Sequence, residues 1–191
     1  MNTLLKYIAN VQTGIYSQTG LSGNVVYLQA KHFDESGTLL DSLIPELPLN
    51  SQTEKHLLNE GDVLFAAKGT KNFATKHESK NGYCVASSTF LVLRLKEDFR
   101  DRILPDYLVW YMNHPKTQEW IKAKARGSSI PSISKIDLSE LEITLPPIEK
   151  QKVIVKIDNL QKTEQNIVKK IQLLKEQYIQ HQLYKAINYE I

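Results

Sequence analysis

The sequence predicts a mixed α+β globular domain over residues 1–146, followed by one long coiled-coil helix over residues 147–191. The first observation is that short strand-like and helix-like segments follow one another in no regular order before residue 146. This order is typical of an α+β domain rather than a doubly wound sheet. The second observation is that no proline or glycine occurs after Pro147, while apolar residues recur with helical spacing.

Three segments of the globular part read as strands. "NVVYLQ" (24–29) is rich in β-formers, and "GDVLFAA" (61–67) starts at a Gly-Asp turn. "STFLVLRL" (88–95) is apolar on both faces, which predicts a buried central strand. All three belong to the expected core.

Two helices and a final strand are predicted before the long helix. "LPDYLVWYMN" (104–113) follows a proline and favours a short helix, and "KTQEWIKAKA" (116–125) favours a second one after the break at His114-Pro115. "LEITL" (141–145) alternates cleanly between apolar and polar residues, as a half-buried strand does.

The long helix carries one apolar stripe with the 3.5-residue period of a coiled-coil seam. Pro147 can occupy its first turn, where a missing N–H costs nothing. Only Glu164 interrupts the seam. The predicted seam positions are Val153, Ile157, Leu160, Glu164, Ile167, Ile171, Leu174 and Tyr178.

A helix of this length is about 60 Å long, whereas a domain of about 146 residues has a diameter of only about 35–40 Å. Part of the stripe therefore needs a second helix, and we expect an intermolecular pair. Two alternatives stay open: the helix could fold back on its own domain, or break near residues 164–166 into a hairpin.

Composition limits the classes of protein that are possible. The single cysteine, Cys84, excludes an intramolecular disulfide and a cysteine-cluster metal site, which suits a reducing compartment such as the cytoplasm. No run of eighteen apolar residues exists, so no membrane span is expected. The N-terminal residues have no apolar core long enough for a signal peptide.

Charge is uneven along the chain although the net charge is only +3. Residues 34–62 carry seven acids against one lysine. Residues 66–82 and 116–135 are basic, each with four or five basic residues against one glutamate. These two stretches either form one positive patch or are ordinary solvated surface.

The two basic stretches are the candidates for nucleic-acid binding. Lysine and arginine supply phosphate contacts, while Asn, Thr, Ser and Lys side chains can read base edges. A Gly-Ser-Ser loop adds backbone N–H groups. The loop can equally be a plain connection. The predicted DNA-binding residues are Lys68, Thr70, Lys71, Asn72, Lys76, Lys80, Arg126, Ser128 and Ser129.

Residues for catalysis are harder to find. "AAKGTK" (66–71) lacks the spacing of a P-loop, and the histidines show no paired ligand spacing. Asp62 with Glu78 and Lys80 faintly resembles the carboxylate–lysine set of a nuclease, a pattern that coincidence explains more readily. The sequence therefore predicts a binding protein that has no cofactor and no metal and is not an enzyme.

Residues 125–160, "ARGSSIPSISKIDLSELEITLPPIEKQKVIVKIDNL", resemble the junction of a type I restriction–modification specificity subunit. In that family a target recognition domain ends in a Gly-Ser/Thr loop and a "PPl.EQ" motif before a long helix. Here the glutamate and glutamine are separated, as Glu149-Lys150-Gln151. Upstream, four segments match weaker motifs in the family's order: "LKYIANVQTGIYSQTG" (5–20), "NVVYLQAKHFDESGTL" (24–39), "LLNEGDVLFAAKG" (57–69) and "LPDYLVWYMNHPKTQEWIKAKARGSS" (104–129).

This resemblance implies a non-catalytic subunit that recognises double-stranded DNA. In such systems modification subunits dock on the long helices and methylate adenine, and a separate restriction motor subunit cleaves. Family members usually carry two recognition domains and two antiparallel helices, whereas this chain has one of each. The resemblance thus implies a half-subunit, either a natural single-repeat form or a truncated one, that homodimerises through antiparallel helices. The rival interpretation is a coiled-coil protein-interaction scaffold that does not bind DNA.

Overall fold

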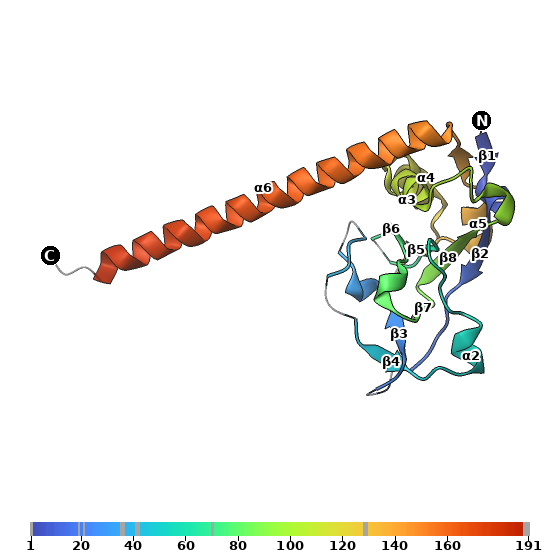
Figure 1. Cartoon of the computed structure of the whole chain (residues 1–191), viewed down its shortest axis with the longest axis horizontal. Helices are drawn as coiled ribbons and strands as arrows, with labels where there is room; N and C mark the ends of the chain where they lie inside the picture. The colour runs from blue at the N-terminus through green and yellow to red at the C-terminus, as the bar shows by residue number, and fades with distance from the viewer. Residues whose placement is uncertain are drawn as a thin grey trace. The chain divides into compact units, whose positions relative to one another are not determined.

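The computed structural model describes residues 2–18, 20, 22–34, 37–40, 43–69, 71–127 and 130–188. It divides into two compact units, Met1–Lys152 and Val153–Ile191. The first unit mixes short strands and helices, and the second consists of the greater part of one helix, α6, which runs from Ile148 to Asn188 (Figure 1). The predicted α+β fold class with a long C-terminal helix is confirmed.

The centre of the first unit is an antiparallel sheet with the strand order β2-β8-β5-β6. Strand β8 (Phe90–Leu95) lies between β2 (Ala9–Thr13) and β5 (Val63–Ala66), and β6 (Ala74–Lys76) forms one edge. The predicted central strand is thus confirmed: Phe90 and Val92 face one layer, Leu91 and Leu93 the other, and all four are buried.

A second sheet has the order β4-β3-β7. Strand β3 (Val25–Leu28) pairs antiparallel with β4 (Pro45–Leu47) and parallel with β7 (Cys84–Ala86). Successive side chains of β3 point to opposite faces. Val26 and Leu28 accordingly join a core with Phe90 and Phe73, whereas Val25 and Tyr27 pack with Leu47 on the other face.

A third, two-stranded sheet joins the beginning of the chain to its late part. Strand β1 (Asn2–Leu4) pairs antiparallel with β9 (Glu142–Thr144), which lies inside the predicted strand 141–145. Four short helices complete this region: α1 (Leu5–Ile8), α3 (Pro105–Asn113), α4 (Pro115–Lys124) and α5 (Lys135–Ser139). Helices α3 and α4 agree with the two helices predicted around His114-Pro115.

The remaining elements are single turns. They are α2 (Ser51–Glu54), whose N-cap Asn50 accepts bonds from two backbone N–H groups, and the 3₁₀ helices η1 (Ala30–His32), η2 (Ser79–Asn81) and η3 (Glu97–Phe99). Among the described residues, no helix combines the length and the apolarity needed to cross a bilayer.

The first turn of α6 belongs to the globular unit, because Gln151 is completely buried there. Its Oε1 accepts from the Leu104 N–H at 3.0 Å, and its Nε2 donates to the carbonyl oxygens of Arg102 and Pro146 at 2.8 and 2.9 Å. Pro147 lies just before the helix, and its carbonyl accepts from the N–H groups of Lys150 and Gln151. The compact unit therefore extends to Lys152, beyond the predicted boundary at residue 146.

Candidate nucleic-acid interface

The two basic stretches meet at Ser132. Arg126 and Ser132 exchange backbone hydrogen bonds of 2.9 and 2.8 Å, and Lys68 pairs with Ser132 from the other side. Neighbouring extended segments lie about 4.8 Å apart, so the Lys68 and Arg126 backbones are separated by about 10 Å. Two segments that are 58 positions apart in the sequence (126 − 68) are thus joined into one surface.

Further backbone bonds hold this junction. The Gly69 N–H donates to the Pro131 carbonyl at 2.8 Å, and the Ile133 N–H donates to the Ala67 carbonyl at 3.0 Å. Ile133 is buried, which ties the junction to the interior. The backbone that carries Lys68 and Arg126 is therefore fixed on both sides.

The side chains of Lys68, Lys71 and Arg126 are exposed, and we call these three residues the basic platform. The Arg126 side chain is 83% exposed, and its Nη2 lies 3.9 Å from Oδ1 of Asp137, a distance at which an exposed pair contributes little. The platform thus presents positive charge to solvent, as binding to phosphate requires.

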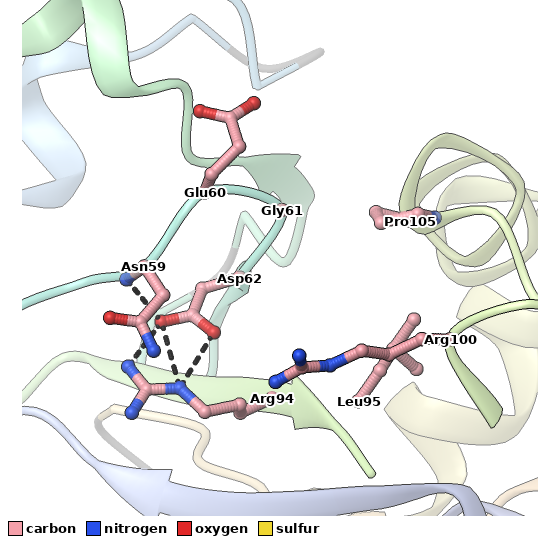
Figure 2. A pocket seen from close by; sticks show the side chains of 8 residues that line it. All are labelled: Asn59, Glu60, Gly61, Asp62, Arg94, Leu95, Arg100 and Pro105. Carbon is pink, nitrogen blue, oxygen red and sulfur yellow. Dashed lines mark hydrogen bonds and ion pairs between the residues drawn. The ribbon is translucent and has the colours of Figure 1, made fainter. Parts of the chain in front are cut away.

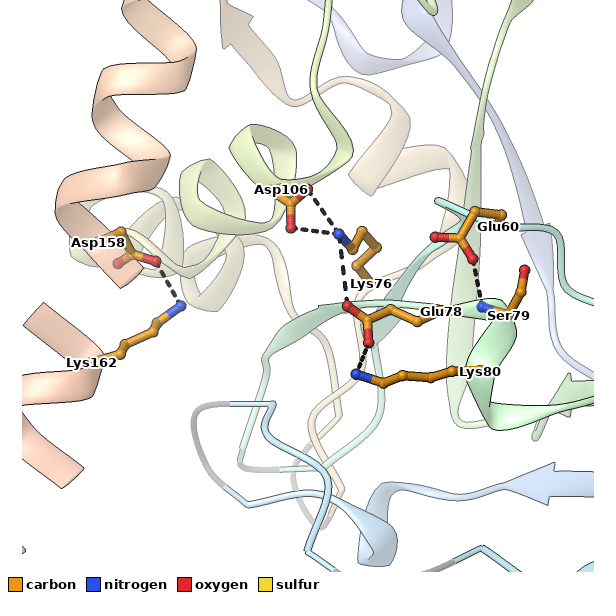
Figure 3. A network of polar contacts seen from close by, with 8 residues as sticks. All are labelled: Glu60, Lys76, Glu78, Ser79, Lys80, Asp106, Asp158 and Lys162. Carbon is orange, nitrogen blue, oxygen red and sulfur yellow. Dashed lines mark hydrogen bonds and ion pairs between the residues drawn. The ribbon is translucent and has the colours of Figure 1, made fainter. Parts of the chain in front are cut away.

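Asn72 and Lys76 have structural partners instead. The Asn72 side chain donates from Nδ2 to the Ala66 carbonyl at 2.8 Å and so closes the turn between β5 and β6. Lys76 pairs with Asp106 at 2.8 Å, which links β6 to the first turn of α3 (Figure 3). Their polar groups are engaged within the fold, which leaves them poorly placed to contact DNA.

Lys80 is exposed but pairs with Glu78, which also lies 3.9 Å from Lys76 (Figure 3). The hydrogen bond to Glu78 raises the pKa of Lys80. The remaining predicted contacts, Thr70, Ser128 and Ser129, lie outside the described residues.

The nuclease-like set does not form a site. Asp62 is buried in a turn of unit one and is bound by the Arg94 guanidinium, whereas Glu78 is bound by lysines. A pocket of about 380 Å³ lies beside Asp62, between Gly61, Arg100 and Pro105 (Figure 2). Within the described part of the chain, no three His, Cys, Asp or Glu residues are grouped to hold a metal ion.

Ser132, Pro131 and Asn113 are the residues of this region that the sequence did not indicate. Ser132 and Pro131 act through backbone atoms, so their side chains carry no signal. The Asn113 carboxamide accepts from the Ala74 N–H at 2.7 Å and donates to the Ala74 carbonyl at 2.8 Å. An asparagine at the end of a helix is common, and its partner is distant in the sequence.

The predicted seam of α6 forms one exposed face within the second unit. Its members turn by about 100° per residue onto a single stripe, and the apolar members are between 46% and 64% exposed. Other large apolar side chains of α6 lie off the seam and are also exposed: Val168, Leu173, Ile179, Leu183, Tyr184 and Ile187. The C-terminal part of the helix is therefore apolar around much of its circumference.

Comparison with known proteins places this architecture in a family. The family model of the type I restriction modification DNA specificity domain matches residues 13–176. Two curated relatives come from Methanocaldococcus jannaschii. The type I restriction enzyme MjaVIII specificity subunit is 28% identical over 82% of this chain and 34% of its own length. The putative MjaX specificity subunit is 33% identical over 56% of this chain and 26% of its own length.

Solved structures show the same fold. An S subunit of a type I restriction-modification system from M. genitalium superposes with a TM-score of 0.60 at 15% identity, covering 92% of this chain and 42% of that one. A chain from a type I R-M system complex gives a TM-score of 0.66 at 19% identity, covering 95% and 43%. The chain spans less than half the length of each of these relatives. With most of its sequence matched by the family model, the chain belongs to the type I restriction modification DNA specificity domain family.

Proposed function

We propose that this chain provides sequence-specific DNA binding in a type I restriction–modification system, and that its basic platform contacts the DNA backbone. The observation that carries the proposal is the junction at Ser132, because it joins Lys68 and Arg126 into one exposed positive surface in a member of this family. The scaffold interpretation, which has no role for such a surface, is not favoured.

The platform acts first through charge. Each lysine or arginine that neutralises a phosphate releases counterions, which makes binding strong at low salt and weaker at high salt. The fixed backbone around Ser132 holds the register of the domain on the duplex. Base edges are then read by side chains of the turn between β5 and β6, where Lys71 is exposed.

The chain forms a two-fold homodimer through antiparallel α6 helices. The exposed seam supports this part of the proposal, because an apolar stripe of this length is stable in water only when a second helix covers it.

Modification subunits bind the same helices on their outer faces, and the restriction motor subunit joins the resulting complex. Two paired helices cover only the seam, so the off-seam apolar residues still need a partner. The chain directs DNA adenine methylation and cleavage, and catalysis resides in the partner subunits.

A two-fold dimer presents the same reading surface twice in opposite orientations. The target is therefore an interrupted palindrome, with two short inverted half-sites around a non-specific spacer. Half-sites read in this way lie about one or two turns of DNA apart, at about 34–36 Å per turn.

The test is to express the full chain with its modification subunit in a host that lacks other adenine methylation, and to map methylated adenines across the genome. The proposal predicts one interrupted palindromic motif that disappears when the chain is omitted. An asymmetric motif would overturn the homodimer, and a methylation pattern that is independent of this chain would overturn the function.

A second experiment tests the platform itself. Single Lys68→Ala and Arg126→Ala substitutions should weaken binding to every duplex alike and reduce the slope of log K against log salt by about one each. Lys76→Ala is the matched control, because Lys76 pairs with Asp106, and its slope should stay near wild type. Unchanged slopes for Lys68 and Arg126 would move the interface elsewhere.

A further inference from the structure

Strand β6 is the edge of the four-stranded sheet, and its edge is closed by a side chain. Ala74 lies opposite Phe65 of β5, while the neighbouring Ala66 N–H donates to the Phe73 carbonyl. Hydrogen-bonded and non-bonded pairs alternate along an antiparallel ladder, so the N–H and C=O of Ala74 point away from β5. Both of these groups are bound by the Asn113 carboxamide, at 2.7 and 2.8 Å.

Asn113 therefore makes the two backbone hydrogen bonds at Ala74 that a neighbouring strand would otherwise make. A carboxamide carries N–H donors beside a carbonyl acceptor, and here Oδ1 accepts from the Ala74 N–H while Nδ2 donates to the Ala74 carbonyl. The protection of an exposed edge is a general need of sheets. The place at which it occurs is informative, because Ala74 directly follows the turn that carries Lys68 and Lys71.

The turn is held from other directions as well. The side chain of Phe73 is buried against Phe90, with ring centroids 6.0 Å apart. A Cβ on Gly37, whose φ is +80°, would lie 2.7 Å from the Ala74 carbonyl oxygen. The backbone at Gly37 therefore packs tightly against β6. Within the turn, the Gly69 N–H donates to the Pro131 carbonyl.

We infer that Asn113 is a positioning residue that pre-forms the DNA-reading turn between β5 and β6. This inference rests on the proposed function. Contacts to base edges require each side chain to be placed to within about half an ångström. Phosphate contacts by long lysine side chains tolerate a looser backbone. Loss of Asn113 therefore reduces discrimination between DNA sequences more than it reduces total affinity.

The test uses the full chain and a pool of random-sequence duplexes. Wild type selects a motif from the pool, and the ratio of affinities for that motif and for an unrelated duplex is then measured. Asn113→Leu should lower this ratio by about tenfold or more, the value of one good base contact, while affinity for the unrelated duplex stays within about twofold. A ratio equal to that of wild type overturns the inference.

Lys76→Met is the matched control, because it removes the other tie between β6 and α3 without touching Ala74. It should lower the melting temperature and leave the ratio unchanged. An equal loss of the ratio in Lys76→Met would show that general loosening of β6, and not Asn113, sets discrimination, and would overturn the inference.

Asn113→Asp keeps the acceptor for the Ala74 N–H and provides a milder variant if Asn113→Leu does not fold. Amide hydrogen exchange then gives a readout without DNA. The Ala67 and Gly69 N–H groups should exchange faster in Asn113→Asp, while the Leu93 N–H in the central strand keeps its protection. Unchanged exchange at Ala67 and Gly69 would overturn the inference. If wild type selects no motif while this exchange result holds, the proposed function fails and the positioning of the turn stands.

Discussion

Arg94 binds the buried carboxylate of Asp62 through two of its nitrogens. Its Nε lies 2.9 Å from Oδ1 and 3.3 Å from Oδ2, and its Nη2 lies 2.6 Å from Oδ2 (Figure 2). Nη2 also donates to the Leu57 carbonyl. The hydrogen bond to Asp62 raises the pKa of Arg94. This pair fixes the turn before β5 onto β8 and occupies the carboxylate that a nuclease interpretation would have used.

Arg94→Ala should therefore destabilise the protein strongly. The change leaves the carboxylate of Asp62, which is only 2% exposed, without its cation. Breaking such a pair by removing one partner costs about 3–5 kcal/mol. Urea unfolding measures this, with Arg100→Ala as the control, since Arg100 is exposed and pairs with Glu97, which is itself exposed. A cost below about 1 kcal/mol for Arg94→Ala would contradict the structural role of the pair.

Stability should fall as the pH drops because of His77. Its side chain is 3% exposed and its Nδ1 has no hydrogen-bond partner among the described atoms. Burial lowers the pKa of His77, and the nearby carboxylates of Asp62, Glu60 and Glu78 only partly oppose this. The unfolded chain then binds more protons than the folded chain between the lowered pKa and about 6.5, so the free energy of unfolding rises with pH in that window.

The measurement is urea unfolding at several pH values from about 5 to 7.5. His77→Phe should flatten the dependence below pH 6.5, the ordinary pKa of histidine. His56→Gln, at an exposed histidine, is the control and should keep the wild-type profile. A profile for His77→Phe that is as steep as that of wild type would assign the dependence to other groups.

Gln151→Leu should weaken the globular unit. It removes all three bonds of a side chain with no solvent exposure and leaves the Leu104 N–H and the carbonyls of Arg102 and Pro146 without this partner. Each buried unsatisfied group costs about 1–3 kcal/mol. Thermal unfolding should show a clear loss, whereas Lys150→Leu at the neighbouring exposed position should change little. Equal melting temperatures for the two variants would show that the bonds of Gln151 are dispensable.

The elements that the sequence predicted are those with a clear apolar pattern along the chain. The both-sided apolar pattern of residues 88–95 identified the central strand, and the absence of proline and glycine after Pro147 identified α6. Neither result depends on distant residues, because burial pattern and helical period are local properties.

Pairing between distant segments was not predictable in this way. The sheet formed by β1 and β9 and the junction of Lys68, Ser132 and Arg126 use backbone groups that every residue has. Lys76 and Asn72 resembled DNA contacts because lysine and asparagine occur both in DNA interfaces and in ion pairs or hydrogen bonds within a fold. Only the positions of Asp106 and Ala66 in space reveal their structural role.

The seam of α6 should hold two chains together. Ile167→Asp with Ile171→Asp would place charges in the paired seam, at a cost of several kcal/mol, and should give a monomer by light scattering at micromolar concentration.

Glu164→Leu should have the opposite effect and raise the melting temperature, because a polar residue in a seam selects register at the expense of stability. A monomeric wild type would exclude the homodimer, and a lower melting temperature for Glu164→Leu would indicate that Glu164 makes a contact in the pair.

The length of α6 should set the distance between the two half-sites. Deleting residues 161–167 removes one heptad and leaves Leu160 and Ile171 in the same seam, so the pair of helices still forms. At 1.5 Å per residue the helix becomes about 10 Å shorter, which corresponds to about three base pairs at 3.4 Å each. Methylome mapping with this variant should give the same half-sites around a spacer that is about three base pairs shorter. Deleting residues 161–162 instead turns the second half of the stripe by about 200° relative to the first half, which breaks the seam and should abolish both dimerisation and methylation. A wild-type spacer in the heptad deletion would mean that the helices do not determine the spacing.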